Sequence, residues 1–179
     1  MAAALSTLPG FRGHAWAEPH AETEATLRAL AIAVLPASLG AERVSAIVAR
    51  FQAWRSAYRA DAELDHGYGH TELRSTGVSP GAGHELQLAA LERAARAEGA
   101  GFAHLPTERQ RVLVASALES AKVTDLPERP DGRHVAADLL AFFFRSSEAS
   151  DLCYGAVIGR DTCRGLPGSE DAPPPLKAR

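Results

Sequence analysis

Three side chains that could bind a metal ion or transfer protons stand close together at Asp65, His66 and His70. Imidazole and carboxylate groups are common zinc ligands, and two histidines four positions apart share one side of a helix. Gly67 and Gly69 disfavour a helix here, and without a distant contributor the segment offers at most three ligands. We therefore interpret it as a loop ordered by hydrogen bonds, whose glycines also allow close approach of a partner, and we expect no metal site.

Other motifs with known chemistry are incomplete. Cys153 and Cys163 are ten positions apart and form no Cys-x-x-Cys pattern, so redox, zinc and haem sites lack support. The sequence leaves open whether these cysteines pair with each other, with a partner or not at all. Gly81-Ala-Gly lacks the third glycine and the preceding strand of a dinucleotide site, and no Gly-x-Ser-x-Gly elbow occurs. We predict no catalytic residue and no cofactor site in this chain.

Composition narrows the class of protein. The 179 residues are 46% hydrophobic, which suits one domain with a core. A net charge of −3 without a basic stripe argues against nucleic-acid binding. The longest uncharged apolar stretch, 29–40, is shorter than the roughly 20 residues of a membrane span. No secretory or twin-arginine signal is evident near the first residue, so the expected location is the cytoplasm.

Apolar residues recur at helical spacing over five segments, which predicts an all-α domain with almost no strand. The predicted helices cover residues 22–35, 40–58, 83–98, 105–122 and 133–147. The clearest apolar stripe comprises Val44, Ile47, Val48, Phe51, Trp54 and Tyr58. Residues 64–80 are polar, Gly-rich and without a period, and are predicted to form a long ordered loop. His84, His104 and His134 stand near helix starts and are expected to be surface or capping residues.

The predicted domain covers residues 21–168, between an extended arm at 1–20 and a flexible Pro-rich tail at 169–179. Its last helix carries Phe142, Phe143 and Phe144, which together span about 200° of the helix circumference at roughly 100° per residue. Because a core normally covers a narrower stripe, at least one Phe should lie under another segment or at an interface. We expect the helix to break at 146–150 and to continue as an irregular Gly-rich segment.

Several short motifs follow one another along the chain: Leu30–Ala37 ending in Pro36-Ala37, Leu105-Pro106 before a helix, Ala141-Phe-Phe, Ser147-Glu-Ala, the Asp151–Gly155 turn and Gly165-Leu-Pro-Gly168. In this order they resemble the gluconate 2-dehydrogenase subunit 3 family. Together they cover most of the chain after Glu22. The resemblance implies a small helical subunit that is itself non-catalytic and is needed for assembly, stability and often export of its partner.

The partner implied by this resemblance is a large FAD-binding oxidoreductase of the glucose–methanol–choline type, which acts on sugars or sugar acids. A cytochrome subunit often accepts the electrons. FAD is then expected in the partner and not in this chain. The residues expected at the interface are Phe142, Phe143, Phe144, Arg145, Tyr154, Arg160, Arg164 and Leu166, with Tyr68, His66 and His70 as a weaker second group.

The chain departs from the family pattern in two ways. Where members typically have Tyr-Gly-Gly-Asn-Arg, Tyr154-Gly155 is followed by Ala156-Val-Ile-Gly-Arg160, so a contact by the usual Asn and Arg would have to be rebuilt with Arg160 and Asp161. Many members also carry a twin-arginine signal, which leaves periplasmic location by co-export with the partner as an alternative. Two other functions stay open: an independent metal protein or enzyme built on the 65–70 loop, and a self-associating helical protein.

Overall fold

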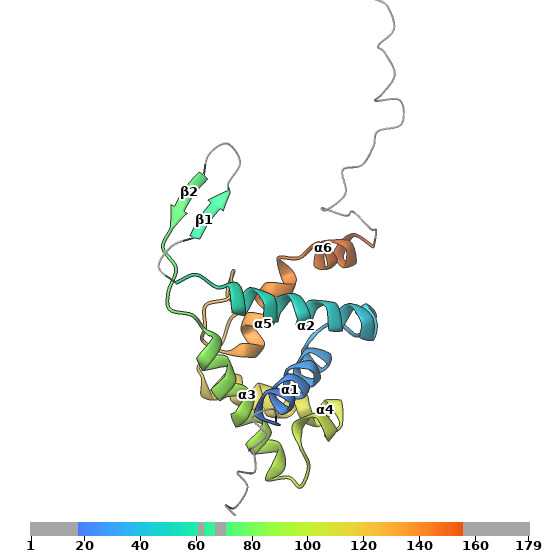
Figure 1. Ribbon diagram of the computed structural model, residues 1–179. Coiled ribbons are helices and arrows are strands. Elements are labelled where there is room, and N and C mark those ends of the chain that lie inside the picture. Colours follow the sequence, from blue (N-terminus) through green and yellow to red (C-terminus); the bar gives the residue numbers. More distant parts are fainter. Residues whose placement is uncertain (1–17, 61–62, 67–70, 156–179) are drawn as a thin grey trace, which may run out of the picture.

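The computed structural model describes residues 18–60, 63–66 and 71–155, and this part of the chain is a small all-α domain with one added hairpin (Figure 1). The elements are α1 (Glu18–Val34), η1 (Ala37–Leu39), α2 (Gly40–Ala57), β1 (Glu63–His66), β2 (Thr71–Arg74), α3 (Gly81–Arg96), η2 (Phe102–His104), α4 (Thr107–Ser120), α5 (Val135–Phe144) and α6 (Ser147–Tyr154). The five predicted helices are confirmed as α1 to α5, with ends that differ by a few residues.

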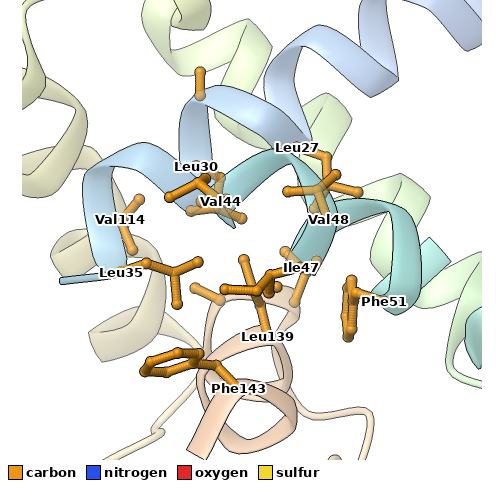
Figure 2. Packing of buried hydrophobic residues seen from close by; sticks show 14 of the residues in the cluster. Leu27, Leu30, Leu35, Val44, Ile47, Val48, Phe51, Val114, Leu139 and Phe143 are labelled. Atoms are coloured by element: carbon orange, nitrogen blue, oxygen red, sulfur yellow. The ribbon is translucent and has the colours of Figure 1, made fainter. Parts of the chain in front are cut away.

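Helix α1 is the centre of the domain, because α2, α3, α4 and α5 all contact it. Its buried Leu27 and Leu30 meet Ile47 of α2 and Leu139 of α5 in one apolar cluster (Figure 2). The stripe predicted for α2 is confirmed, since Val44, Ile47, Val48 and Phe51 are buried there. Burial of each large apolar side chain contributes roughly 1.5–3 kcal/mol, so this cluster is the main source of stability.

A sharp bend separates α1 from α2. Pro36 cannot continue α1, and Gly40 adopts a φ of +75°, which an L side chain rarely allows. No single helix in the described residues is long and apolar enough to cross a membrane. Taken together, the segments Thr23–Val34 and Ala37–Ala57 reach the length and apolar composition of a membrane span, by these two criteria only. The two segments are bent by 107° relative to each other, and they supply core residues such as Leu27 and Ile47.

The predicted loop at 64–80 is partly wrong, because it contains an antiparallel hairpin. Glu63 pairs with Arg74, and the register continues to His66 opposite Thr71. The hairpin projects from the C-terminal end of α2, away from α4 (Figure 1). Two runs of four residues flanking a short Gly-containing connection are a hairpin pattern, but runs this short give little alternation to detect.

The predicted irregular segment after Ser146 is also wrong up to Gly155, because the chain forms α6 there. The Oγ of Ser146 accepts a hydrogen bond from the N–H of Ala149 at 3.3 Å, which caps the helix. Gly155 ends the helix in the left-handed region with a φ of +60°. The polar Ser, Glu and Asp residues of this helix resemble loop composition, although the cap pattern itself is readable from the sequence.

Candidate functional site

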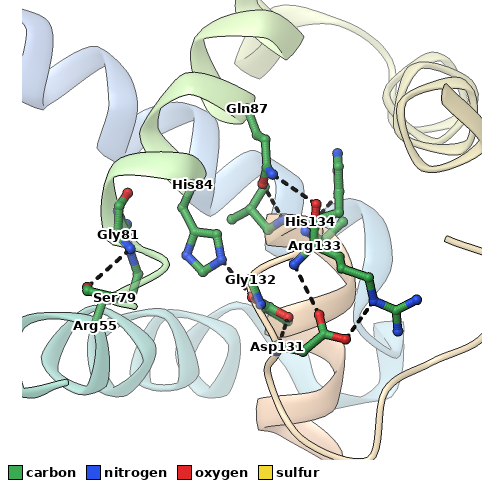
Figure 3. Close-up of polar contacts among 12 residues, drawn as sticks. Arg55, Ser79, Gly81, His84, Gln87, Asp131, Gly132, Arg133 and His134 are labelled. Atoms are coloured by element: carbon green, nitrogen blue, oxygen red, sulfur yellow. Dashed lines mark hydrogen bonds and ion pairs between the residues drawn. The ribbon is translucent and has the colours of Figure 1, made fainter. Parts of the chain in front are cut away.

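A buried polar cluster joins α3 to the start of α5 (Figure 3). His84 and Asp138 are both 0% exposed, and the His84 Nε2 and Asp138 Oδ2 atoms are 2.7 Å apart. The same carboxylate accepts hydrogen bonds from the N–H groups of Asp131 and Gly132, each at 2.9 Å. Both carboxylate oxygens therefore have partners, as a buried carboxylate requires. We call these residues the His84–Asp138 cluster.

Two side chains next to the cluster fix the turn into α5. Gln87 donates from Nε2 to the carbonyl of Arg133 at 3.0 Å, and its Oε1 accepts from the N–H of Val135 at 2.7 Å. His134 caps the helix, because its Nδ1 accepts from the N–H of Ala136 at 3.2 Å. This bond needs an unprotonated Nδ1. Burial lowers the pKa of His134 below its ordinary value of 6.5, which favours the neutral form that the cap requires.

An imidazole oriented by a carboxylate is also the arrangement of a general base. Here, however, the His84 ring is fully buried and lies against Phe51, with ring centroids 5.7 Å apart. Its second nitrogen, Nδ1, has no hydrogen-bond partner in the described part of the chain. The ring is fully enclosed in this structure, and the geometry supports a structural role in which the cluster joins α3 to α5.

The histidine predictions have mixed outcomes. A surface or capping role is wrong for His84, which shares one face of α3 with the buried Leu88 and Leu91. His134 is confirmed as a capping residue and His104 is exposed. A buried histidine on an apolar helix face needs a polar partner, and the sequence did not show that Asp138 would supply it.

A second polar centre ties α1 to α3 and η2. One carboxylate oxygen of Glu92 accepts from the hydroxyl of Thr26 at 3.1 Å and from the N–H of Phe102 at 3.0 Å, while the other accepts from Arg96 at 3.1 Å. Thr26, Glu92 and Arg96 border a cavity of about 460 Å³. Because both oxygens of the carboxylate are already bonded, we assign Glu92 a structural role.

A larger groove, of about 590 Å³, is lined in part by the loop that precedes α5. We call it the Arg–aromatic groove. It is bordered by the C-terminal half of α2, the segment before α3, the loop at 129–131 and the C-terminal end of α5. The lining residues are Arg50, Trp54, Tyr58, Ser75, Thr76, Gly77, Val78, Pro80, Arg129, Pro130, Asp131, Phe142, Arg145 and Ser146. A volume of this size is within the range of sites that bind small molecules or short peptide segments.

Aromatic rings form one wall of the groove. The ring of Trp54 lies 5.6 Å from that of Tyr58 and 6.0 Å from that of Phe142, as measured between centroids. Phe51 lies behind them in the core, 5.5 Å from both Trp54 and Phe142. The wall is thus anchored to the core and keeps its shape without a ligand.

Hydrogen bonds hold the opposite wall against α2. The hydroxyl of Tyr58 donates to the carbonyl of Gly77 at 3.2 Å, and the hydroxyl of Thr76 donates to the carbonyl of Arg59 at 2.8 Å. The segment before α3 is therefore fixed in place although it has no regular structure. At its rim the side chain of Val78 is 87% exposed, which leaves an apolar edge facing solvent.

The charges of the groove come mainly from arginine. Among the described residues that line it, Arg50, Arg129 and Arg145 are positive and Asp131 is negative. Asp131 is bound by the guanidinium of Arg133 at 2.6 Å, and Arg50 is bound by Glu148 at 2.5 Å. Burial opposes ionisation of Glu148, but the hydrogen bond from Arg50 and further hydrogen bonds lower its pKa overall.

The structure places the predicted interface residues in different environments. Phe143 is 0% exposed and packs in the core, so it is not available to a partner in this conformation. Phe142 and Arg145 line the Arg–aromatic groove. Phe144 and Tyr154 are 52% and 74% exposed, at the end of α5 and the end of α6. The three consecutive Phe residues therefore have three roles: groove wall, core and surface.

Several other predictions fall outside the described residues. They concern Tyr68, His70, Arg160, Arg164, Leu166 and Cys163, together with most of the arm at 1–20 and the tail at 169–179. His66 lies in β1, but its side chain and that of Asp65 are also outside the described part. Within that part, no three His, Cys, Asp or Glu side chains are grouped to hold a metal ion. Cys153 is exposed on α6, and its pairing stays a prediction.

Arg50, Trp54, Tyr58 and Arg129 are among the groove residues that the sequence prediction did not identify. Trp54 and Tyr58 continue the apolar stripe of α2 and were assigned to the core. A readable signal exists at Arg50 and Trp54, because positions four apart share a helix face and place a cation beside an aromatic ring. No local pattern indicates that Arg129 would join them, because the loop that carries it is distant in the sequence.

Comparisons of the chain with protein-family models, with curated proteins and with solved structures gave no match. The resemblance to the gluconate 2-dehydrogenase subunit 3 family therefore stays a hypothesis, which rests on the motifs quoted for it.

Proposed function

We propose that this chain is a non-catalytic accessory subunit that binds, stabilises and helps to mature a large FAD-dependent dehydrogenase of the glucose–methanol–choline type acting on sugars or polyols. The observation that carries the proposal is the exposure of Phe144 and Tyr154, at 52% and 74%, on the consecutive helices α5 and α6. The motif order that suggests the family supports the same conclusion. Arg145, which follows Phe144 directly, adds a cation to this surface.

The chemistry of this surface fits a protein partner. Aromatic residues and arginine contribute most of the binding energy at many interfaces, and Phe144, Arg145 and Tyr154 are of these types. A subunit that binds only the folded partner stabilises it by roughly 2.7 kcal/mol at a hundredfold excess over Kd. Such a subunit needs no catalytic group, and the buried His84–Asp138 pair is inaccessible to a substrate.

The expected setting of the complex follows from the family. FAD is held by the large subunit, and a cytochrome subunit serves as electron acceptor where one is present. We propose that this chain and its partner work in the cytoplasm, with export of the complex by a signal on the partner as the alternative.

Co-purification from the native host tests the proposal. The tagged chain is captured gently, and the visible spectrum and component masses of the captured material are recorded. We expect a yellow complex with flavin absorption bands and a much larger partner. The double variant Phe144→Ala, Tyr154→Ala should lose the partner, whereas Leu86→Ala, which removes another exposed apolar side chain from α3, should retain it.

Three results would contradict the proposal. A colourless lone protein would remove the support for a flavoenzyme partner. A colourless dimer in light scattering, dissociated by the double variant, would instead assign the Phe144 and Tyr154 surface to self-association. A chain that carries stoichiometric zinc or iron would favour the metal-protein alternative built on the 65–70 segment.

A further inference from the structure

The charged side chains that line the Arg–aromatic groove differ in whether another side chain forms an ion pair with them. Arg50 is bound by Glu148, and Asp131 is bound by Arg133, so these two groups are already paired. Arg145 is exposed, and no described residue forms an ion pair with it. Its charge stands beside an aromatic wall that includes Phe142 and Trp54. The groove thus offers a cation and an apolar face to a ligand that is not part of the described chain.

We infer that this groove binds an acidic segment of the partner protein, a segment that also carries an apolar side chain. A carboxylate of the segment would pair with Arg145, and its apolar side chain would lie against Trp54 and the exposed Val78. Arginine binds carboxylates through two parallel hydrogen bonds, which gives such a contact direction as well as attraction.

Continuity with the proposed interface favours a protein segment over a small molecule. Arg145 of the groove follows the exposed Phe144 directly, so a partner seated on Phe144 reaches the groove without crossing another element. The walls are held by ring contacts and by the bonds of Tyr58 and Thr76, so little reorganisation opposes binding. This inference rests on the proposed function, because it names the chemistry of that partner at one place.

Trp54 provides a direct measurement of groove occupancy. The chain has two tryptophans, Trp16 and Trp54, so the variant Trp16→Phe leaves Trp54 as the sole tryptophan. The full-length variant is titrated, at constant ionic strength, with a twelve-residue peptide of Glu, Asp, Leu and Pro. We expect a saturable change in Trp54 emission. A peptide with Lys in place of Glu and Asp should give none.

Charge variants locate the binding. Arg145→Glu should raise the Kd of the peptide roughly tenfold or more, because it replaces an attraction with a repulsion. Arg145→Gln should have a smaller effect in the same direction. Arg43→Glu changes the same charge at an exposed position of α2 outside the groove and should leave Kd unaltered. Circular dichroism and Tm of each variant verify that the fold is intact.

Four results of the Trp54 titrations would overturn the inference. They are the absence of saturable binding, equal binding of the Lys peptide, equal affinity for citrate, and a Trp54 signal that changes when the chain is truncated after Gly168. The citrate result would assign the groove to free anions, and the truncation result to the chain's own tail. A flavoprotein that co-purifies equally with wild type and with Arg145→Glu would refute the groove contact while leaving the proposed function intact. If no flavoprotein co-purifies with wild type, the proposed function fails, and with it the partner named in this inference.

Discussion

The His84–Asp138 cluster and the Arg–aromatic groove share the loop that precedes α5, but the charged group of the cluster is buried and that of the groove is exposed. In the cluster, the N–H groups of Asp131 and Gly132 donate to the fully buried carboxylate of Asp138. The neighbouring Arg129 and Pro130 of the same loop line the groove, as does the exposed Arg145. A buried charge whose partners all come from the chain contributes to folding, whereas an exposed cation beside aromatic rings is available for binding. Because one loop serves both, the cluster also holds the groove in shape.

Removal of Asp138 should have the largest effect. Asp138→Ala leaves the buried His84 ring and two part-buried backbone N–H groups without this partner, and breaking a buried pair typically costs about 3–5 kcal/mol. Urea unfolding followed by circular dichroism measures the loss. Glu119→Ala, at an exposed position of α4, is the control and should change the free energy of unfolding by less than about 0.5 kcal/mol. A loss below about 1 kcal/mol for Asp138→Ala would show that the cluster is not the anchor of this loop.

Substitutions of two neighbouring phenylalanines, Phe143 and Phe144, should distinguish an effect on folding from an effect on partner binding. Phe143→Ala should destabilise the domain by about 3–5 kcal/mol, because it opens a cavity in the core. Phe144→Ala removes a side chain that is 52% exposed and should cost less than about 1 kcal/mol while weakening partner capture. Thermal unfolding and capture assays on both variants measure the two effects. Equal destabilisation by the two substitutions would contradict the assigned environments.

Acidification should weaken the cap of α5. Burial lowers the pKa of His134 from its ordinary 6.5, so the folded state favours the neutral ring. The stability from this preference is fully present above pH 6.5, the ordinary value, and is lost as the pH falls below it toward the folded-state pKa. His134→Asn keeps a capping side chain without a titrating ring. In this variant Tm should depend less on pH below 6.5 than it does in the wild type. His104→Asn, at an exposed position, should leave the profile unchanged; a profile that is unaltered in His134→Asn would refute this role.

The ion pair at the edge of the groove should have the smallest effect on stability. The side chain of Arg50 is 46% exposed, so solvent screens its bond to Glu148 and we expect a contribution of about 0–1 kcal/mol. Since the pKa of Glu148 is lowered, this contribution is present above the carboxylate's ordinary 4.5 and is lost as the pH falls below it. A double-mutant cycle with Arg50→Ala and Glu148→Ala measures it. A coupling energy above about 2 kcal/mol would mean that the groove edge is more rigid than a surface pair allows.

Sequence patterns predicted the fold well where burial follows a regular period, as in the stripe from Val44 to Phe51. They missed α6, where the cap at Ser146 defines the helix more clearly than any apolar face does. Phe142 and Arg145 were predicted as binding residues, but Trp54 and Arg129 were not. The groove forms from a helix and a loop that are distant in sequence, so its residue set depends on tertiary packing, which local spacing does not encode.

Amide hydrogen exchange on the captured complex tests the central claim most directly, because it reports which backbone segments the partner protects. Partner binding should slow exchange at residues 75–80 and 142–155, which border the groove and the exposed Phe144 and Tyr154. Exchange in α4 (Thr107–Ser120), which borders neither feature, should stay unchanged. Protection confined to α4, with no slowing at residues 142–155, would contradict the proposed binding surface.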